Sequence, residues 1–239
     1  MFDEEAMTDR MPPGERQRPT LYGRRKGKKL RTHHSLLVEE LLPQMTVAPE
    51  ALASSPRDVF ARALDDLWLE VGFGGGEHLA HDAGRHRDIG FIGCEPFLNG
   101  VAKLLALIEE NDLDNIRIHG GDALDVLKAL PDASLGRVTI LYPDPWPKTY
   151  QKKRRFISDT SVEEMARALR PGCELHFATD IDDYSAWALA RILRSNRFDW
   201  RASTASDWTT PWAQWLGTRY EAKAIAAGRK PVYLTFVKR

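Results

Sequence analysis

The chain has little cysteine, no long apolar run and no net charge. Of its 239 residues only Cys94 and Cys173 are cysteines, and no CxxC spacing occurs. This argues against a disulfide framework or a structural zinc site and favours a reducing compartment. No apolar run approaches the length of a membrane span, and the acidic start MFDEE is unlike a secretion signal. We therefore expect a cytoplasmic protein that makes no use of a membrane.

The zero net charge conceals a strong segregation of charge. Residues 16–38 contain no acid. The segment includes prolines and glycines and has no apolar periodicity. Such a segment repels itself and stays extended unless a polyanion neutralises it, so residues 1–35 are predicted to form a disordered basic arm ahead of one domain, residues 36–239. A second basic cluster begins at Lys148, and two separated basic patches indicate a nucleic-acid partner. The basic residues of the arm are Arg16, Arg18, Arg24, Arg25, Lys26, Lys28, Lys29 and Arg31.

The domain alternates between strand-like and helix-like segments. Residues 36–45, 77–84, 101–108, 126–130, 162–169 and 186–193 have helical periodicity, and a further helix is expected near Asp58. Such alternation predicts an α/β fold, a doubly wound and mostly parallel sheet covered on both faces. The expected strands are residues 67–71, 89–95, 116–119, 138–141, 174–178, 198–201 and 232–237.

The glycine-rich turn after the first strand lacks the third glycine of the dinucleotide-binding fingerprint. Its spacing is G-x-G-G-G-E, in which Gly72, Gly74 and Gly76 let the backbone approach a ligand and Glu77 replaces the missing glycine. Glu70, just before the turn, would repel a pyrophosphate but would attract an ammonium group. The turn therefore predicts a nucleotide-like cofactor that carries no pyrophosphate.

Four carboxylates stand at the ends of successive expected strands: Glu70, Glu95, Asp122 and Asp144. The carboxyl ends of parallel strands are where open α/β sheets bind their ligands, and an acid after the second strand suits ribose hydroxyls. A cationic cofactor without phosphate, S-adenosylmethionine, fits this lining better than NAD does. The alternative interpretation is that these acids lie solvated in loops.

The stretch PDPWPKTYQKKRR, residues 143–155, joins a carboxylate, an indole and a basic cluster. Its three prolines stiffen the exit from a buried strand and hold Asp144 at the strand's carboxyl end. Trp146 either stacks on a target base or packs in the core. The combination indicates chemistry on a nucleobase, with a proline-rich surface turn before a basic helix as the alternative.

Other polar residues receive simpler interpretations. His78 and His81 lack a convergent third ligand and are expected at the surface, so no metal site is predicted. Asp182 and Asp183 are expected to begin a helix, where acids are favourable. The insertion before the last strand is expected to be packed by Trp208, Trp212 and Trp215.

Several of these elements resemble the bacterial tRNA (guanine-N7-)-methyltransferases. The resemblance runs from about Leu36 to the C-terminus and is carried by LEVGFGGGEH, the acids at Glu95 and Asp122, PDPWPKTYQKKRR and the tail GTRYE. It implies a seven-stranded, Rossmann-like methyltransferase domain that uses S-adenosylmethionine to methylate N7 of guanine 46 in the tRNA variable loop. The basic arm is not a matched motif, so its contact with tRNA is inferred from charge alone.

The resemblance also implies roles for individual residues. Asp144 is the expected catalytic residue. The residues expected to contact the cofactor are Glu70, Gly72, Gly74, Glu95, Asp122 and Asp144. The residues expected to hold the target nucleotide are Lys148, Asp180, Thr218, Arg219, Tyr220 and Glu221. Those expected to contact RNA are Tyr150, Gln151, Lys152, Lys153, Arg154 and Arg155.

Two other functions compete with this hypothesis. A NAD-dependent oxidoreductase would need the complete glycine fingerprint, and Glu70 and Glu77 weigh against it. A tRNA-binding protein that has lost catalysis would not be expected to keep acids at all four strand ends.

Overall fold

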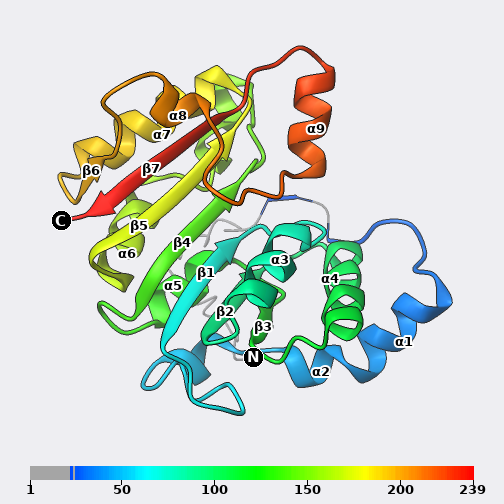
Figure 1. The fold of residues 1–239 in the computed structure, drawn as a ribbon. Coiled ribbons are helices and arrows are strands. Elements are labelled where there is room, and N and C mark those ends of the chain that lie inside the picture. The colour runs from blue at the N-terminus through cyan, green and yellow to red at the C-terminus, as the bar shows by residue number, and fades with distance from the viewer. Residues whose placement is uncertain (1–21, 24) are drawn as a thin grey trace, which may run out of the picture.

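The computed structural model describes residues 22, 23 and 25–239, which form a seven-stranded sheet between two layers of helices (Figure 1). The strand order is β3-β2-β1-β4-β5-β7-β6. β3, β2, β1, β4 and β5 run parallel, and β7 lies antiparallel between β5 and β6. The strands are β1 (Asp66–Val71), β2 (Ile89–Cys94), β3 (Ile116–His119), β4 (Leu135–Leu141), β5 (Leu169–Thr179), β6 (Phe198–Trp200) and β7 (Val232–Lys238). The predicted fold class is confirmed.

Two groups of helices cover the two faces of the sheet. α3 and α4 pack together with α1 on one face, and α5, α6 and α7 pack on the other (Figure 1). The helices are α1 (Thr32–Glu40), α2 (Leu42–Met45), α3 (Glu77–Arg85), α4 (Leu98–Asn111), α5 (Ala123–Ala129), α6 (Asp159–Ala168), α7 (Asp182–Arg194), α8 (Ser206–Thr209) and α9 (Arg219–Ala226), with short 3-10 helices η1 (Pro49–Leu52) and η2 (Thr149–Arg154). None of the described helices is long and apolar enough to cross a membrane.

The central strands are apolar because both of their faces are buried. In β2, Ile92 packs with the core on the α5–α7 side, whereas Phe91 packs with α3 and α4. Cys94 and Cys173 are free thiols, as the sequence predicted, and burial raises the pKa of the Cys94 thiol so that it stays protonated. The parallel register sets the ends of β1, β2, β3 and β4 at one edge of the sheet.

The predicted helix near Asp58 is wrong, because this segment forms turns. Its backbone carbonyls are bound by side chains instead of by a helical ladder: Arg57 donates to the carbonyl of Asp65 (3.0 Å), and Arg117 donates to that of Val59 (2.7 Å). Long-range partners therefore override the local preference of the sequence.

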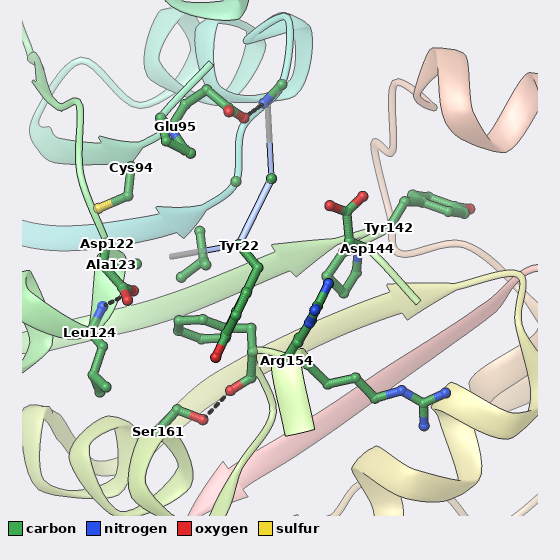
Figure 2. Close-up of a pocket in the computed structure, with 18 of the residues that line it drawn as sticks. Tyr22, Cys94, Glu95, Asp122, Ala123, Leu124, Tyr142, Asp144, Arg154 and Ser161 are labelled. Atoms are coloured by element: carbon green, nitrogen blue, oxygen red, sulfur yellow. Dashed lines mark hydrogen bonds between the residues drawn. The ribbon is translucent and has the colours of Figure 1, made fainter. Parts of the chain in front are cut away.

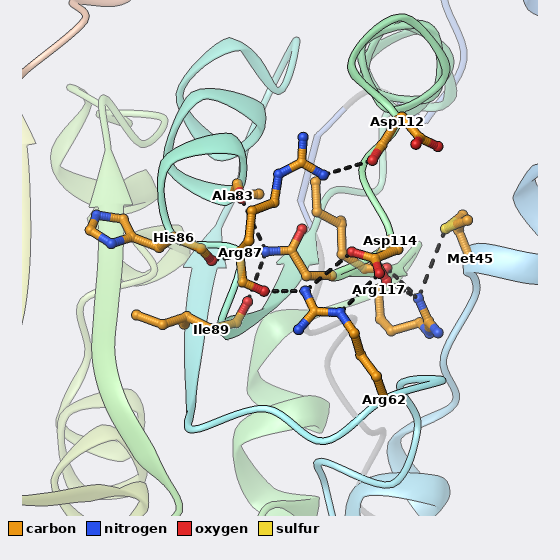
Figure 3. Close-up of polar contacts among 11 residues, drawn as sticks. Met45, Arg62, Ala83, His86, Arg87, Ile89, Asp112, Asp114 and Arg117 are labelled. Carbon is orange, nitrogen blue, oxygen red and sulfur yellow. Dashed lines mark hydrogen bonds and ion pairs between the residues drawn. The ribbon is translucent and has the colours of Figure 1, made fainter.

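Polar contacts connect the segments at the amino-terminal ends of the strands (Figure 3). Asn115 is almost fully buried, and its amide donates to the carbonyls of Ala83, His86 and Ile89. Arg62 forms an ion pair with Asp114 at 2.9 Å. These contacts are structural, and they tie the loop of residues 53–65 to the end of the sheet.

The predicted arm lies largely outside the described residues. Its described part contacts the domain: the Leu98 amide donates to the carbonyl of Arg25 (3.0 Å), and the Asn99 side chain bonds Gly27 and Lys28 (2.7 Å each). The helix predicted at residues 36–45 is present, but it begins at Thr32, inside the predicted arm, and is divided at Leu41.

Three helical segments near the C-terminal half of the chain were not predicted: η2, α8 and α9. The strand predicted at residues 174–178 also extends further, since β5 starts at Leu169 and runs through Pro171 and Gly172. α9 is stabilised by a capping box between Thr218 and Glu221, a feature that sets a helix start without apolar periodicity.

Candidate active site

A cavity of about 700 Å³ lies at the carboxyl ends of β1, β2, β3 and β4. Ligand pockets of small molecules have volumes in this range. Figure 2 shows Glu95, Asp122 and Asp144 around it, with Tyr22 and Arg154 between them. The predicted cofactor residues Gly72, Gly74, Glu95, Asp122 and Asp144 are therefore brought together, and they line one cavity.

The glycine turn after β1 forms one wall of the cavity. Gly74 has a φ of +59°, a left-handed conformation that glycine adopts without strain, and its carbonyl lies so close to Gly100 that a Cβ there would be 2.1 Å from the oxygen. Gly72 also has a positive φ and open space beside it. Gly76 is not among the lining residues; it packs against Leu104 and opens α3.

Glu95 joins this turn to the end of β2. Its carboxylate accepts from the amides of Gly74 (2.8 Å) and Phe97 (2.9 Å), so each oxygen keeps a further lone pair. Burial raises the pKa of Glu95, and the two backbone donors oppose that shift. Within the part of the chain that the structure describes, Glu95 forms no ion pair, so a bound cation or hydroxyl donors would stabilise its charge.

Asp122 stands at the end of β3, where it also caps α5. Its side chain accepts from the amide of Leu124 at 3.0 Å, and this N-cap bond fixes the carboxylate at the cavity wall. Its neighbours Ala123 and Leu124 also line the cavity and provide an apolar surface beside the acid. This pairing of an acid and an apolar surface suits a purine nucleoside.

The Asp144 loop, residues 142–148, is held in an unusual backbone conformation. Tyr142 and Trp146 have φ values of +48° and +41°, in the left-handed region that non-glycine residues rarely adopt. Such conformations cost about 1–3 kcal/mol each and persist where the surroundings hold them. Partial desolvation in the cavity raises the pKa of Asp144.

Trp146 lies at the cavity in a cluster with the ring of Tyr22 and the guanidinium of Arg154. The Arg154 guanidinium lies 4.9 Å from the ring centroid of Trp146 and 4.9 Å from that of Tyr22. The two rings themselves meet edge to face at 6.3 Å. Trp146 is half-buried, lines the cavity and belongs to none of the hydrophobic clusters, so it does not pack in the core; its stacking on a target base stays a prediction.

Arg155 differs from its basic neighbours because its side chain is fully buried. It donates to the carbonyl of Pro145 at 2.8 Å and forms an ion pair with Asp183. The sequence predicted that Arg155 contacts RNA. Arg155 is among the residues that line the cavity, but its side chain has no exposed surface, so this placement gives the predicted contact no support.

The other members of the basic segment are more accessible. Lys153 is exposed and lines the cavity, Lys148 and Tyr150 are exposed, and Gln151 is half-buried. Lys152 forms an ion pair with Asp183 at 2.6 Å. The predicted contacts of these residues with RNA or the target nucleotide remain predictions that their exposure allows.

The tail element divides into two residues that line the cavity and two that are structural. Arg219 and Tyr220 line the cavity opposite Glu95. Thr218 is the N-cap of α9 and accepts from the Glu221 amide at 3.0 Å. Glu221 is buried and accepts from Trp215 (2.7 Å) and from Tyr233. The predicted substrate contact of Glu221 is not supported by this placement, because its carboxylate is committed to the protein.

Asp180 and Glu70 also lie outside the cavity lining. Asp180, at the end of β5, pairs with Arg229. Glu70 is buried, and its carboxylate is 2.8 Å from Nδ1 of His78. The predicted contact of Glu70 with a cofactor is therefore not supported here.

His78 is not a surface residue, contrary to the prediction. Its side chain is only 12% exposed, and its ring lies 5.1 Å from that of Trp215. Burial lowers the pKa of His78, but the Glu70 charge and hydrogen bond outweigh this effect and leave it raised. His81 is half-buried. The expected packing of the insertion is confirmed, since Trp212 stacks on His176 at 4.5 Å, and Trp208 packs against the core.

Two contributors to the site were missed by the sequence analysis: Tyr22 from the arm and the pairing of His78 with Glu70. Tyr22 carried no signal, because an aromatic residue in a basic segment has no periodicity to place it. The pairing of His78 with Glu70 did have a sequence signal. A helix that starts after a tight turn brings its first-turn side chains back toward the end of the preceding strand.

The residues of the cavity fit the group that the carboxylate pattern predicted. A buried acid that forms no ion pair with any described residue, a raised pKa at both Glu95 and Asp144 and an apolar wall suit a cationic nucleoside such as S-adenosylmethionine. Among the described residues no cluster of three or more His, Cys, Asp or Glu side chains is placed to hold a metal ion.

Comparison with known proteins agrees with the fold and with the cavity. The family described as "Putative methyltransferase" matches residues 65–234. The chain is 49% identical to the tRNA (guanine-N(7)-)-methyltransferase of Nitrobacter hamburgensis, over 91% of this chain and 86% of that protein. It is 48% identical to the enzyme of the same name from Brucella anthropi, over 91% and 94%. The 16S rRNA methyltransferase KamB shares the fold, with a TM-score of 0.52, 17% identity and coverage of 89% and 98%.

The matches to the curated relatives extend over nearly the whole chain. The family match covers the strands β1 to β5 that carry the acids, the PDPW element and the tail. The chain belongs to the family of bacterial tRNA (guanine-N7-)-methyltransferases.

Proposed function

We propose that this protein binds S-adenosylmethionine in the cavity and methylates N7 of guanine 46 in the variable loop of tRNA. The observation that carries this proposal is the position of Asp144. It lines a cofactor-sized cavity together with Glu95 and Asp122, and the basic residues of η2 follow it in the sequence, two of which, Lys153 and Arg154, also line the cavity. The relatives' shared name, tRNA (guanine-N(7)-)-methyltransferase, supports the same substrate.

The carboxylates have distinct tasks in this proposal. Glu95 and the glycine turn would hold the ribose and amino-acid parts of the cofactor, and Asp122 would hold the adenosine beside Leu124. When bound, S-adenosylmethionine supplies an electrophilic methyl group. These residues fix its orientation and replace the water that would otherwise solvate it, which is the main requirement for a displacement between two bound molecules.

Asp144 acts on the guanine rather than on a proton. Guanine N7 carries a free lone pair, so its methylation needs no general base. The base gains positive charge as the new bond forms, and a carboxylate held beside it stabilises that charge. The rigid loop keeps Asp144 at the cavity, and partial desolvation there raises the pKa of its carboxyl.

RNA recognition is assigned to the cations and aromatic rings in and near the cavity. Lys148, Lys153, Arg154 and Arg219 would contact phosphates or the target nucleotide, and Trp146 and Tyr220 offer rings on which a displaced base stacks. Tyr150, Gln151, Lys152, Asp180 and Thr218 remain proposed secondary contacts. The arm adds sequence-independent attraction for the tRNA backbone.

The test is methylation of a defined tRNA followed by chemical cleavage. The protein is incubated with labelled S-adenosylmethionine and an unmodified tRNA transcript, and the product is treated with borohydride and aniline, which cleave at N7-methylguanine. We expect one cleavage site, at guanine 46, and none in a transcript with adenine at that position. Binding of tRNA without label transfer would identify a protein that has lost catalysis, and cleavage at another guanine would contradict the assigned position.

A further inference from the structure

Arg155 is the cation of the basic segment that solvent does not reach. The exposed fraction of its side chain is 0%, whereas Lys152, three residues before it, is 25% exposed. Its guanidinium lies over the rings of Tyr184 and Trp187, at 4.7 and 5.0 Å from their centroids. A planar, weakly hydrated cation is the only basic side chain suited to such a position.

The polar contacts of Arg155 connect two parts of the site that are far apart in the sequence. Nε donates to the Pro145 carbonyl at 2.8 Å, and Nη1 donates to the carbonyl of Asp183 at 3.3 Å. Nη2 pairs with the Asp183 carboxylate, which also accepts from Lys152. The bonds from Lys152 and Arg155 lower the pKa of Asp183, so this carboxylate remains ionised at neutral pH.

The bond to Pro145 acts on the peptide that links Pro145 to Trp146, and Trp146 has one of the strained φ values in the loop, +41°. Rotation of this peptide would relax Trp146 toward a negative φ and would change the conformation of the loop that carries Asp144. A charged donor on the carbonyl opposes the rotation. On the other side of the loop, the Tyr142 amide is bound to the Ala178 carbonyl at 2.8 Å.

We propose that Arg155 is a positioning residue: it anchors the Asp144 loop to the first turn of α7 through Pro145 and Asp183, and does not contact RNA. Its effect on methyl transfer rests on the function proposed above, whereas its effect on the loop does not. Removal of the Arg155 guanidinium therefore lowers the rate of methyl transfer in the enzyme–tRNA complex without lowering the affinity for tRNA.

The charge-conserving variant Arg155→Lys separates these two roles. Lysine keeps the positive charge but cannot reach Pro145 and Asp183 together, because it lacks the planar fork. We expect kcat to fall about tenfold to a hundredfold, since small displacements of a reacting group have effects of this size. KM for tRNA is expected to change less than about twofold, and the slope of log affinity against log salt to stay unchanged.

Two matched variants complete the comparison. Lys153→Gln removes an exposed cation from the same segment, so it should weaken tRNA binding and reduce the salt slope by about one. Asp183→Asn removes the other end of the Arg155 contact from a side chain that is 53% exposed, so it tests the anchor even if Arg155→Lys fails to fold. It should reproduce the loss in kcat with tRNA affinity unchanged.

Amide hydrogen exchange supplies a measurement that does not depend on activity. In Arg155→Lys and Asp183→Asn, the amides of residues 142–148 should exchange faster, while those inside β1 and α4 should not change. Unchanged exchange at the loop in both variants, or a raised KM and smaller salt slope with kcat intact, would overturn the proposal. If the wild-type protein fails to methylate tRNA, the proposed function is lost, but the exchange comparison still decides whether Arg155 holds the loop.

Discussion

At the scale of single residues, the chemistry of the site depends on where each carboxylate obtains its hydrogen bonds. Glu95 and Asp122 accept from backbone amides of the turns that they organise, whereas Glu221 and Glu70 are committed to other side chains. Acids at the ends of neighbouring strands can therefore have different tasks: Glu95 lines the cavity, whereas Glu70 supports the structure around it.

Asp144→Asn is expected to lower kcat by about a hundredfold to a thousandfold, because a neutral amide stabilises the developing positive charge far less than a carboxylate does. The wild-type rate should rise with pH through the raised pKa of Asp144 and then remain flat, since no general base is required. Single-turnover methyl transfer over a range of pH measures both. Asp182→Asn, which changes an exposed acid outside the cavity, is the matched control. Full turnover in Asp144→Asn would contradict the assignment.

The two buried histidines should have opposite effects on the pH dependence of stability. The pKa of His78 is raised by Glu70, so its contribution is fully present below its unfolded value of about 6.5 and is lost as pH rises through the folded value. His78→Gln should therefore destabilise the protein more at about pH 6 than at about pH 8.5. Urea unfolding at the two pH values measures the difference.

His176 provides the control for this prediction. Burial lowers its pKa, with Glu174 opposing, so its protonation destabilises the folded state as pH falls below about 6.5. In His176→Gln the free energy of unfolding, relative to wild type, should increase toward acidic pH. If both variants show the same sign of pH dependence, the assigned environments are incorrect.

At the scale of elements, the start of a short helix and a strained loop bring side chains to the cavity. α9 has 8 residues, and its first turn carries Arg219 and Tyr220 into the cavity wall. The helix begins where it does because Thr218 and Glu221 cap each other's backbone amides, and Glu221 is further bound by Trp215 and Tyr233. The position of two cavity residues thus depends on one capping box.

Thr218→Ala should lower the free energy of unfolding by about 1 kcal/mol, the usual cost of losing an N-cap side chain. For a protein of this size that corresponds to about 2–4 °C in melting temperature. Denaturant and thermal unfolding measure it, and Thr218→Ser, which retains the hydroxyl, should recover most of the loss. An equal loss in the serine variant would show that the methyl group rather than the cap is responsible.

At the scale of the whole molecule, neutral net charge coexists with a one-sided electrostatic field. The chain has 34 basic and 34 acidic residues, yet the segment that precedes α1 and the segment that follows Asp144 are both basic. The described part of the first segment, from Tyr22 onward, reaches the cavity and α4. The two basic segments therefore border the same site.

Replacing Lys26, Lys28 and Lys29 together with glutamine should weaken tRNA binding and reduce the slope of log affinity against log salt by about two to three. The reason is that fewer counterions are released from tRNA when fewer phosphate contacts form. Filter binding or fluorescence anisotropy over a range of salt measures this slope. Lys128→Gln, which changes an exposed residue of α5 outside both basic segments, should leave the slope unchanged. An unaltered slope in the triple variant would exclude the arm from tRNA binding.

The sequence by itself determined the seven strands, the main helices between them and the end of the sheet at which the acids meet. Apolar alternation specifies buried strands, and the parallel arrangement brings their carboxyl ends together. This is why the sequence was enough to predict that Gly72, Gly74, Glu95, Asp122 and Asp144 lie together, and they line one cavity.

The tertiary structure alone decided what the remaining charged residues do. Arg155 reads as one more cation in KKRR, and only the packing of α7 against the loop shows that it is buried between Pro145 and Asp183. Glu70, His78 and Glu221 likewise find their partners on other elements. The physical reason is that local sequence sets the backbone, whereas the ionic and hydrogen-bond partner of a buried charge comes from whatever distant segment packs beside it.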